Sequence, residues 1–368
     1  MNQNKISKKC FLVLQDGSIY PGYSFGAERA VSGEVVFNTG MVGYEQALTD
    51  PSYSGQILIF TYPLIGNYGV AKNEFDKNKL SRYFESEKIH PFGLIVSEYC
   101  SRYSHFSASK SLSEFLIENH IPAIAGIDTR ALTKKIRECG TMPGKIVFEE
   151  NDALDFYDPD NDDLVKLVTS KKIIRYNSIG GKSKVVLIDC GVKHSIIKNL
   201  IKQNLEVIRV PYDYDFTKNI DYDAVFISNG PGDPMNCSRT IEILRKCLNG
   251  RKPVFGICLG NQLLALAVGA KTYKLKYGHR SQNQPCINTE TKRCYITSQN
   301  HGFAIDDKTL PQDWKPWFFN ANDGTNEGIK HKTKPFMSVQ FHPEANPGPN
   351  DTQYLFAEFA KLINEGEK

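Results

Sequence analysis

One cysteine stands between two glycines in the apolar run PVFGICLGNQLLALAVG, residues 253–269. Gly256 and Gly260 lie two residues before and two residues after Cys258. A G-x-C-x-G junction between a strand and a helix is typical of a nucleophile elbow, which lifts a reactive side chain above a sheet. Free N–H groups at the start of the helix favour a thiolate, and the N–H of Leu259 is placed to receive an oxyanion. The pentapeptide alone leaves open a buried cysteine that only packs.

A histidine and a glutamate, His342 and Glu344, stand at the end of the run KPFMSVQFHPE, residues 334–344. Proline disfavours the helical region for the residue before it, so His342 is expected to be extended. Because residues two apart in an extended chain project to the same side, Glu344 can orient the imidazole and stabilise its charged form. With Cys258 these residues are the parts of an activated thiol. Taken alone, HPE also fits a surface turn after a strand.

Two further loops carry residues that a ligand could approach. In FISNGPGDP, residues 226–234, Gly230 and Gly232 flank a proline and leave backbone N–H groups uncovered. A plain Gly-Pro loop would have the same sequence. In SQNHGF, residues 298–303, Asn300 and Phe303 could equally close a turn.

The elements that must position these residues begin at Lys184. Short apolar runs, each ending in Gly or Pro, alternate with helical stretches; the runs are VVLIDCG, LEVIRVP, AVFISNGPG and PVFGICLG, and the helical stretches are SIIKNLIKQN and RTIEILRKCL. This alternation predicts a mostly parallel sheet with helices on both faces. In such sheets, chemistry gathers at the carboxyl ends of the strands, and Cys258 follows one of them.

The amino half has a different pattern. Short strand-like runs mix with turn signals, and SKSLSEFLIENH is predicted to be a helix that begins at a serine. The stretch after it is acidic and poor in periodicity. We therefore predict an α/β protein with a mixed α/β domain at 1–150, a linker at 151–182 and a second domain at 183–368.

Composition argues against several classes of protein. The chain has 368 residues, 40% of them hydrophobic, and a net charge of +4 without a basic stripe, so no nucleic-acid partner is expected. The start has no apolar leader, and the longest apolar run, LLALAV, is too short to span a bilayer, so no membrane association is expected. Nine cysteines without a CxxC pair suggest reduced thiols in the cytoplasm, no disulfide framework and no metal site.

The assembled motifs resemble a known family. SNGPGDP, GICLGNQ and FHPE resemble the class I, triad-type glutamine amidotransferases, which places such a domain at 183–368. In the amino half, residues 33–69, which include DPSYS, and residues 125–144, AGIDTRALTKKIRECGTMPG, are similar to the carbamoyl-phosphate synthetase small-chain family. KYGHRSQNQP and FHPEANPGP fit the same family, and the resemblance covers nearly the whole chain.

The resemblance implies hydrolysis of L-glutamine to glutamate and ammonia through a glutamyl thioester on Cys258. His342 would shuttle protons, Glu344 would orient His342, and Gly232 and Leu259 would supply oxyanion N–H groups. The residues that the resemblance assigns to glutamine binding are Ser52, Gly230, Gly232, Leu259, Gln262, Asn300, Gly302 and Phe303.

The resemblance also implies a division of labour between two chains. This chain would hold no cofactor, whereas a separate large chain would use ATP, Mg and bicarbonate. The large chain would receive the ammonia and form carbamoyl phosphate for arginine and pyrimidine biosynthesis. The resemblance implies that Ser52 completes the glutamine site from the domain at 1–150. Because that domain carries no catalytic constellation, we expect it to provide much of the surface that docks to the large chain.

One position departs from the family pattern, and two other functions stay open. Asn261 stands where the family usually has histidine, in CLGNQ rather than CLGHQ. The alternatives are another glutamyl hydrolase on the same scaffold and a catalytically silent regulatory subunit.

Overall fold

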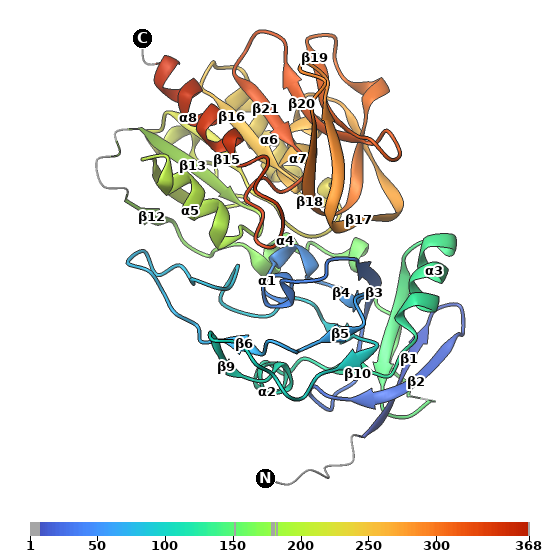
Figure 1. The fold of residues 1–368 in the computed structure, drawn as a ribbon. Helices are drawn as coiled ribbons and strands as arrows, with labels where there is room; N and C mark the ends of the chain where they lie inside the picture. Colours follow the sequence, from blue (N-terminus) through green and yellow to red (C-terminus); the bar gives the residue numbers. More distant parts are fainter. Residues whose placement is uncertain (1–7, 151, 178–180, 182, 367–368) are drawn as a thin grey trace. The chain divides into compact units, whose positions relative to one another are not determined.

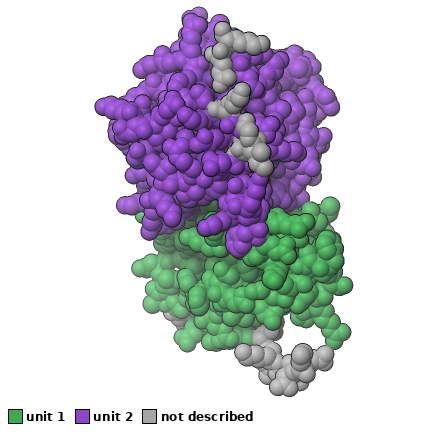
Figure 2. All heavy atoms as spheres, turned by 90° about the vertical axis from the view of Figure 1, so that its left-hand side faces the viewer, with its two compact units in different colours: residues 1–74, 81–162 green, residues 75–80, 163–368 purple. Residues whose placement is uncertain are grey.

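The computed structural model describes residues 8–150, 152–177, 181 and 183–366, and its chain forms two compact units (Figures 1 and 2). Unit 1 comprises residues 1–74 and 81–162, and unit 2 comprises residues 75–80 and 163–368. The predicted linker at 151–182 includes residues 151, 178–180 and 182, which lie outside the described part. Among the helices of the described part, none is long and apolar enough to cross a membrane.

Unit 1 is built around a closed barrel of strands in the order β1-β11-β3-β4-β7-β10-β2. Its strands are β1 (Lys9–Leu14), β2 (Ile19–Ser24), β3 (Val31–Asn38), β4 (Gln56–Phe60), β5 (Leu64–Ile65), β6 (Val70–Ala71), β7 (Gly93–Ile95), β8 (Glu98–Tyr99), β9 (Ala108–Lys110), β10 (Ala123–Ala125) and β11 (Met142–Val147). Its helices are α1 (Tyr44–Leu48), η1 (Pro51–Tyr53), α2 (Leu112–Glu118), α3 (Thr129–Cys139) and η2 (Pro159–Asn161).

The helix predicted in the amino half is α2. Its capping box pairs the Ser111 side chain with the backbone N–H of Glu114, while the Glu114 carboxylate accepts from the Ser111 N–H. Leu112, Phe115 and Leu116 are its buried residues and join the core of unit 1. Helical spacing of apolar residues behind a serine cap therefore predicted this element correctly.

Unit 2 contains a ten-stranded sheet in the order β12-β14-β13-β15-β16-β21-β20-β19-β17-β18 (Figure 1). Its strands are β12 (Ile174–Tyr176), β13 (Lys184–Asp189), β14 (Glu206–Pro211), β15 (Ala224–Ile227), β16 (Val254–Ile257), β17 (Lys271–Asn288), β18 (Cys294–Asp306), β19 (Trp314–Asn320), β20 (Asn326–His331) and β21 (Phe336–Val339). Its helices are α4 (Val165–Val168), α5 (His194–Lys202), η3 (Phe216–Lys218), η4 (Pro234–Asn236), α6 (Ser238–Leu248), α7 (Leu259–Ala267), η5 (Asp307–Thr309) and α8 (Tyr354–Gly366).

Two hydrophobic layers cover the parallel half of this sheet, which runs from β14 through β13, β15 and β16 to β21. Successive residues of β13 enter opposite layers: Val185 and Leu187 pack with α5 and α8, whereas Val186 and Ile188 pack with α6 and α7. Helices thus lie on both faces of a parallel sheet, which confirms the predicted α/β fold class.

The sheet continues beyond β21 in antiparallel strands. β20, β19, β17 and β18 extend it, and β17 and β18 form a long hairpin with two register shifts. The polar sequence of this hairpin gave no strand signal. It nevertheless carries the SQNHGF motif to the carboxyl end of β16.

Candidate active site

Cys258 stands at a strained turn between β16 and α7. Its backbone adopts φ 55° and ψ −108°, outside the regions that residues with side chains favour. A Cβ at Gly256 would lie 2.5 Å from the carbonyl oxygen of Gly260, and a Cβ at Gly260 would overlap the carbonyl of Ile227. Close backbone packing therefore requires glycine on both sides, as the nucleophile-elbow interpretation predicts.

The structure brings a buried histidine and glutamate to the same turn. Glu344 Oε1 lies 2.6 Å from His342 Nδ1, and both side chains are buried. The Cys258 N–H donates to the Val339 carbonyl at 2.9 Å, which ties the elbow to β21, the strand that precedes His342. Since Nδ1 faces the carboxylate, Nε2 is the ring nitrogen left to exchange a proton with the thiol.

A buried lysine completes this ionic group. Lys193 Nζ lies 3.1 Å from Glu344 Oε1 and donates to the Ala345 carbonyl at 2.7 Å. Lys193 precedes α5 and is only 3% exposed. Nothing in the sequence singled it out, because its partners lie about 150 residues downstream.

The electrostatics of the group favour an ion pair. Burial opposes a charge on the imidazole, but the Glu344 carboxylate and the neighbouring Cys258 sulfur raise the pKa of His342 overall. Burial likewise opposes a charge on the carboxylate, but Lys193 and His342 lower the pKa of Glu344 overall. At neutral pH the site therefore holds an imidazolium against an ionised carboxylate.

Three residues assigned to substrate binding, Gly230, Leu259 and Asn300, lie near Cys258. Leu259 is the first residue of α7, and a Cβ at Gly230 would lie 2.7 Å from its side chain. The Asn300 carbonyl oxygen lies 3.6 Å from the Cys258 sulfur, which donates to it.

Four other assigned residues lie on α7, on β18 and in the loop after β15. Gln262 donates from Nε2 to the Phe303 carbonyl at 2.9 Å, which joins α7 to β18. Gly302 lies between Asn300 and Phe303, and a Cβ there would stand 3.3 Å from an Arg280 nitrogen. Gly232, in the loop after β15, has a φ of 83°, which favours glycine.

Asn261 forms its own buried network in place of the family's usual histidine. Its Nδ2 donates to Gln340 Oε1 at 3.1 Å, and its Oδ1 accepts from the Ser338 hydroxyl at 2.7 Å. Gln340 Oε1 also accepts from Gln262 at 3.1 Å. Asn261 therefore has a structural role behind the Cys258 turn, where its hydrogen bonds link α7 to β21.

Ser52 belongs to unit 1, whereas the other assigned residues belong to unit 2. It is buried in η1, and its backbone N–H donates to the Asp50 side chain at 3.0 Å. Its predicted role in glutamine binding stays a prediction.

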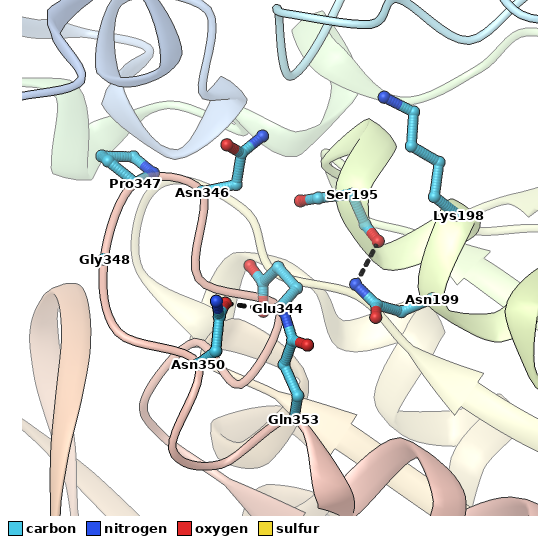
Figure 3. Close-up of a pocket in the computed structure, with 9 residues that line it drawn as sticks. All are labelled: Ser195, Lys198, Asn199, Glu344, Asn346, Pro347, Gly348, Asn350 and Gln353. Carbon is cyan, nitrogen blue, oxygen red and sulfur yellow. Dashed lines mark hydrogen bonds between the residues drawn. The ribbon is translucent and has the colours of Figure 1, made fainter.

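A polar cavity of about 350 Å³ lies beside Glu344 (Figure 3). α5 contributes Ser195, Lys198 and Asn199, and the segment after Glu344 contributes Asn346, Pro347, Gly348, Asn350 and Gln353. Both flanks are stabilised internally, since Asn199 donates to the Ser195 carbonyl and Gln353 donates to Asn350, each at 2.8 Å. Glu344 borders this cavity, although its carboxylate remains buried.

Two family models match the chain. Residues 186–362 match the model for glutamine amidotransferase class-I. Residues 12–146 match the model for the CPSase domain of the carbamoyl-phosphate synthase small chain.

Similar proteins include single chains and much longer ones. The arginine-specific small chain of carbamoyl phosphate synthase from Aspergillus oryzae is 49% identical over 95% of this chain and 79% of its own length. The multifunctional protein CAD of Squalus acanthias is 53% identical over 96% of this chain, which spans only 16% of that protein. The human mitochondrial carbamoyl-phosphate synthase [ammonia] is 49% identical over 97% of this chain and 24% of its own length.

Proposed function

The chain belongs to the carbamoyl phosphate synthase small-chain family, and from this premise we propose that it hydrolyses L-glutamine to glutamate and ammonia. The observation that carries the proposal is the strained Cys258 turn beside the buried His342–Glu344 pair. A sulfur nucleophile, a proton carrier and an orienting carboxylate are the components of acyl transfer through a thioester.

The first half of the reaction forms the thioester. His342 already holds the thiol proton as an imidazolium, and the sulfur attacks the amide carbon of the glutamine side chain. The N–H groups of Gly232 and Leu259 stabilise the oxyanion. When the C–N bond breaks, the imidazolium gives its proton to the leaving nitrogen, so ammonia departs and a glutamyl thioester remains on Cys258.

The second half releases glutamate. His342 takes a proton from water, whose oxygen attacks the thioester carbonyl. The C–S bond breaks, and the sulfur leaves with the bonding electron pair beside the imidazolium, which restores the starting pair. Glu344 keeps Nδ1 protonated throughout, so that Nε2 carries every transferred proton.

Substrate selection would come from the residues around the elbow. Gln262, Asn300 and Phe303 are already held together by α7 and β18, and Ser52 would complete the site from unit 1. A glutamyl hydrolase of broader specificity is the alternative, and turnover of other γ-glutamyl compounds without a partner would favour it.

The ammonia would pass to a separate large chain that uses ATP, Mg and bicarbonate to form carbamoyl phosphate, in the cytoplasm. The fungal small-chain relative is named arginine-specific, and a pyrimidine role is the other possibility that the resemblance implies. This chain would itself hold no cofactor, and unit 1 would provide the docking surface.

A labelling experiment tests the proposal against a catalytically silent subunit. One relative is named for ammonia, so the proposal rests on Cys258 rather than on family membership alone. A glutamine-analogue chloroketone should alkylate Cys258, and added glutamine should slow the reaction. The exposed Cys139 and Cys294 serve as internal controls by mass spectrometry, and they should not show glutamine protection. Absence of an adduct at Cys258 would support the silent subunit.

A further inference from the structure

A buried cluster of two histidines and one glutamate lies on the antiparallel strands of unit 2. His279 comes from β17, His301 from β18 and Glu327 from β20, and their exposures are 7%, 4% and 0%. Their ligand-type atoms all lie within 4.8 Å of one another. Because the three residues are far apart in sequence, no sequence motif predicts the cluster.

The surroundings of His279 identify it as a charged ring. Its Nδ1 lies 3.2 Å from Glu327 Oε1, and its Nε2 lies 2.8 Å from Asp323 Oδ2. Carboxylate oxygens only accept hydrogen bonds, so both ring nitrogens must carry protons. An imidazolium has no lone pair for a metal ion, and this arrangement therefore favours a proton-bearing cluster over a metal centre.

His301 connects the cluster to the proposed active site. Its Nδ1 lies 2.8 Å from the Phe303 carbonyl oxygen, and only a protonated nitrogen can donate there. Its Nε2 lies 3.2 Å from Gln299 Oε1 and 3.7 Å from Glu327 Oε1. The same Phe303 carbonyl accepts from Gln262 Nε2 at 2.9 Å. Two donors from different elements therefore fix this carbonyl.

We propose that Glu327 is a positioning residue for glutamine binding, acting through His279 and His301 on the segment Asn300–Phe303. The inference rests on the proposed function, because that segment is assigned to glutamine. The Glu327 carboxylate neutralises the buried imidazolium of His279 and borders the ring of His301, so its charge keeps both rings in place. Held in this way, His301 keeps the Phe303 carbonyl against Gln262 while the Asn300 carbonyl faces the Cys258 sulfur.

Kinetics of Glu327→Gln test this assignment. The variant keeps the shape of the side chain but removes the buried negative charge. We expect KM for glutamine to rise about tenfold while kcat stays within about twofold, because the segment positions the substrate and not the proton carrier. The matched control is Glu290→Gln, which removes a carboxylate that pairs with Lys315 and Lys330 outside the cluster. KM values for the two variants that agree within about twofold would overturn the proposal.

If Glu327→Gln does not fold, Asp323→Asn tests the proposed role of the cluster. Asp323 contacts the same imidazolium, but its side chain is 43% exposed, so its loss should be tolerated. KM should rise in the same direction by about threefold, since the exposed carboxylate is already partly screened by water. An unchanged KM in a folded Asp323→Asn protein would count against the proposal.

Amide hydrogen exchange separates this inference from the proposed function, because it needs no turnover. In Glu327→Gln, peptides that contain residues 300–303 should exchange at least about threefold faster, while peptides from β13 in the same unit keep their wild-type rate. Faster exchange at 300–303 in a protein without glutaminase activity would retain the cluster's role and reject the proposed function. Unchanged exchange in a protein that hydrolyses glutamine would reject the cluster's role alone.

Discussion

Two buried glutamates, one in each unit, have pKa values shifted in opposite directions. In unit 1, Glu45 is 7% exposed and accepts the backbone N–H of Ala71, and burial raises its pKa to about 7. In unit 2, Glu344 is 2% exposed, and although burial opposes its charge, Lys193 and His342 lower its pKa overall. The difference lies in the partners and not in the depth of burial.

Glu45 links two secondary-structure elements, whereas Glu344 is suited to catalysis. An N–H donor satisfies Glu45 as a link between α1 and β6, and burial without a cation favours its neutral form. Buried cations keep Glu344 ionised, so it can hold an imidazolium in place. A buried side chain that charged neighbours keep ionised is typical of a functional site.

Cys258→Ser should have the largest effect, since it leaves the charged partners of Glu344 in place and removes only the nucleophile. We expect glutamine-driven carbamoyl phosphate synthesis to disappear in the complex with the proposed large chain, while ammonia-driven synthesis persists. A hydroxyl is far harder to ionise than a thiol, so the ion pair alone should not rescue turnover. Product formation from glutamine and from ammonium salt is measured side by side. Equal loss with both donors would contradict the assignment.

His342→Asn should rank next, because it removes the proton carrier and one cation beside Glu344. Glutaminase should fall by roughly a thousandfold, the usual scale of a lost general base. Single-turnover formation of the thioester measures the step directly, and the thermal unfolding midpoint checks that the variant folds. Near-normal thioester formation would show that another group takes the thiol proton.

Lys193→Met should make Glu344 behave more like Glu45. Without the lysine, burial again favours the neutral carboxyl, so the acid limb of the glutaminase pH profile should move to higher pH. We expect activity at neutral pH to fall about tenfold. Lys198→Met is the matched control, since Lys198 lies one turn into α5 and lines the neighbouring cavity. A pH profile identical to that of Lys198→Met would show that Lys193 does not hold the charge of Glu344.

The sequence allowed the nucleophilic half of the site to be predicted for a physical reason. Apolar runs ending in glycine mark buried parallel strands, and the glycines beside Cys258 are dictated by the close approach of two backbones. The extended backbone of His342, which forms a β-bridge with Ser298, likewise follows from the local steric effect of Pro343. Local rules of this kind can be read without knowing the fold.

The remaining parts depend on contacts that no local pattern encodes. The hairpin of β17 and β18 has a polar sequence, because much of its burial is against other polar groups such as Glu327. Lys193 became recognisable only when the fold placed it beside Glu344. The closure of unit 1 into a barrel is a property of strand pairing, which short strand-like runs do not specify.

The two glutamates also predict opposite responses of stability to pH. The contribution of Glu344, whose pKa is lowered in the folded chain, is present above its ordinary range and lost as pH falls through the folded value. The pH dependence of the Glu45 contribution to stability has the opposite sign, because the pKa of Glu45 is raised to about 7. Its contribution is complete in acid and is lost as pH rises from its ordinary range to about 7.

Glu45→Gln should have the smallest effect and the opposite sign, a gain in stability confined to higher pH. At pH of about 8 the wild-type carboxyl ionises in a buried setting at a cost on the order of 3 kcal/mol, which a neutral amide avoids. Part of this gain is offset because the new NH₂ group needs a partner, so we expect a rise of about 5 °C in the unfolding midpoint of unit 1. At pH of about 5, where Glu45 is protonated, the variant should match or fall below the wild type. Calorimetric scans at the two pH values measure the difference, with the exposed Glu98→Gln as control. A variant whose advantage did not depend on pH would show that Glu45 is ionised like Glu344, and the contrast between the two units would fail.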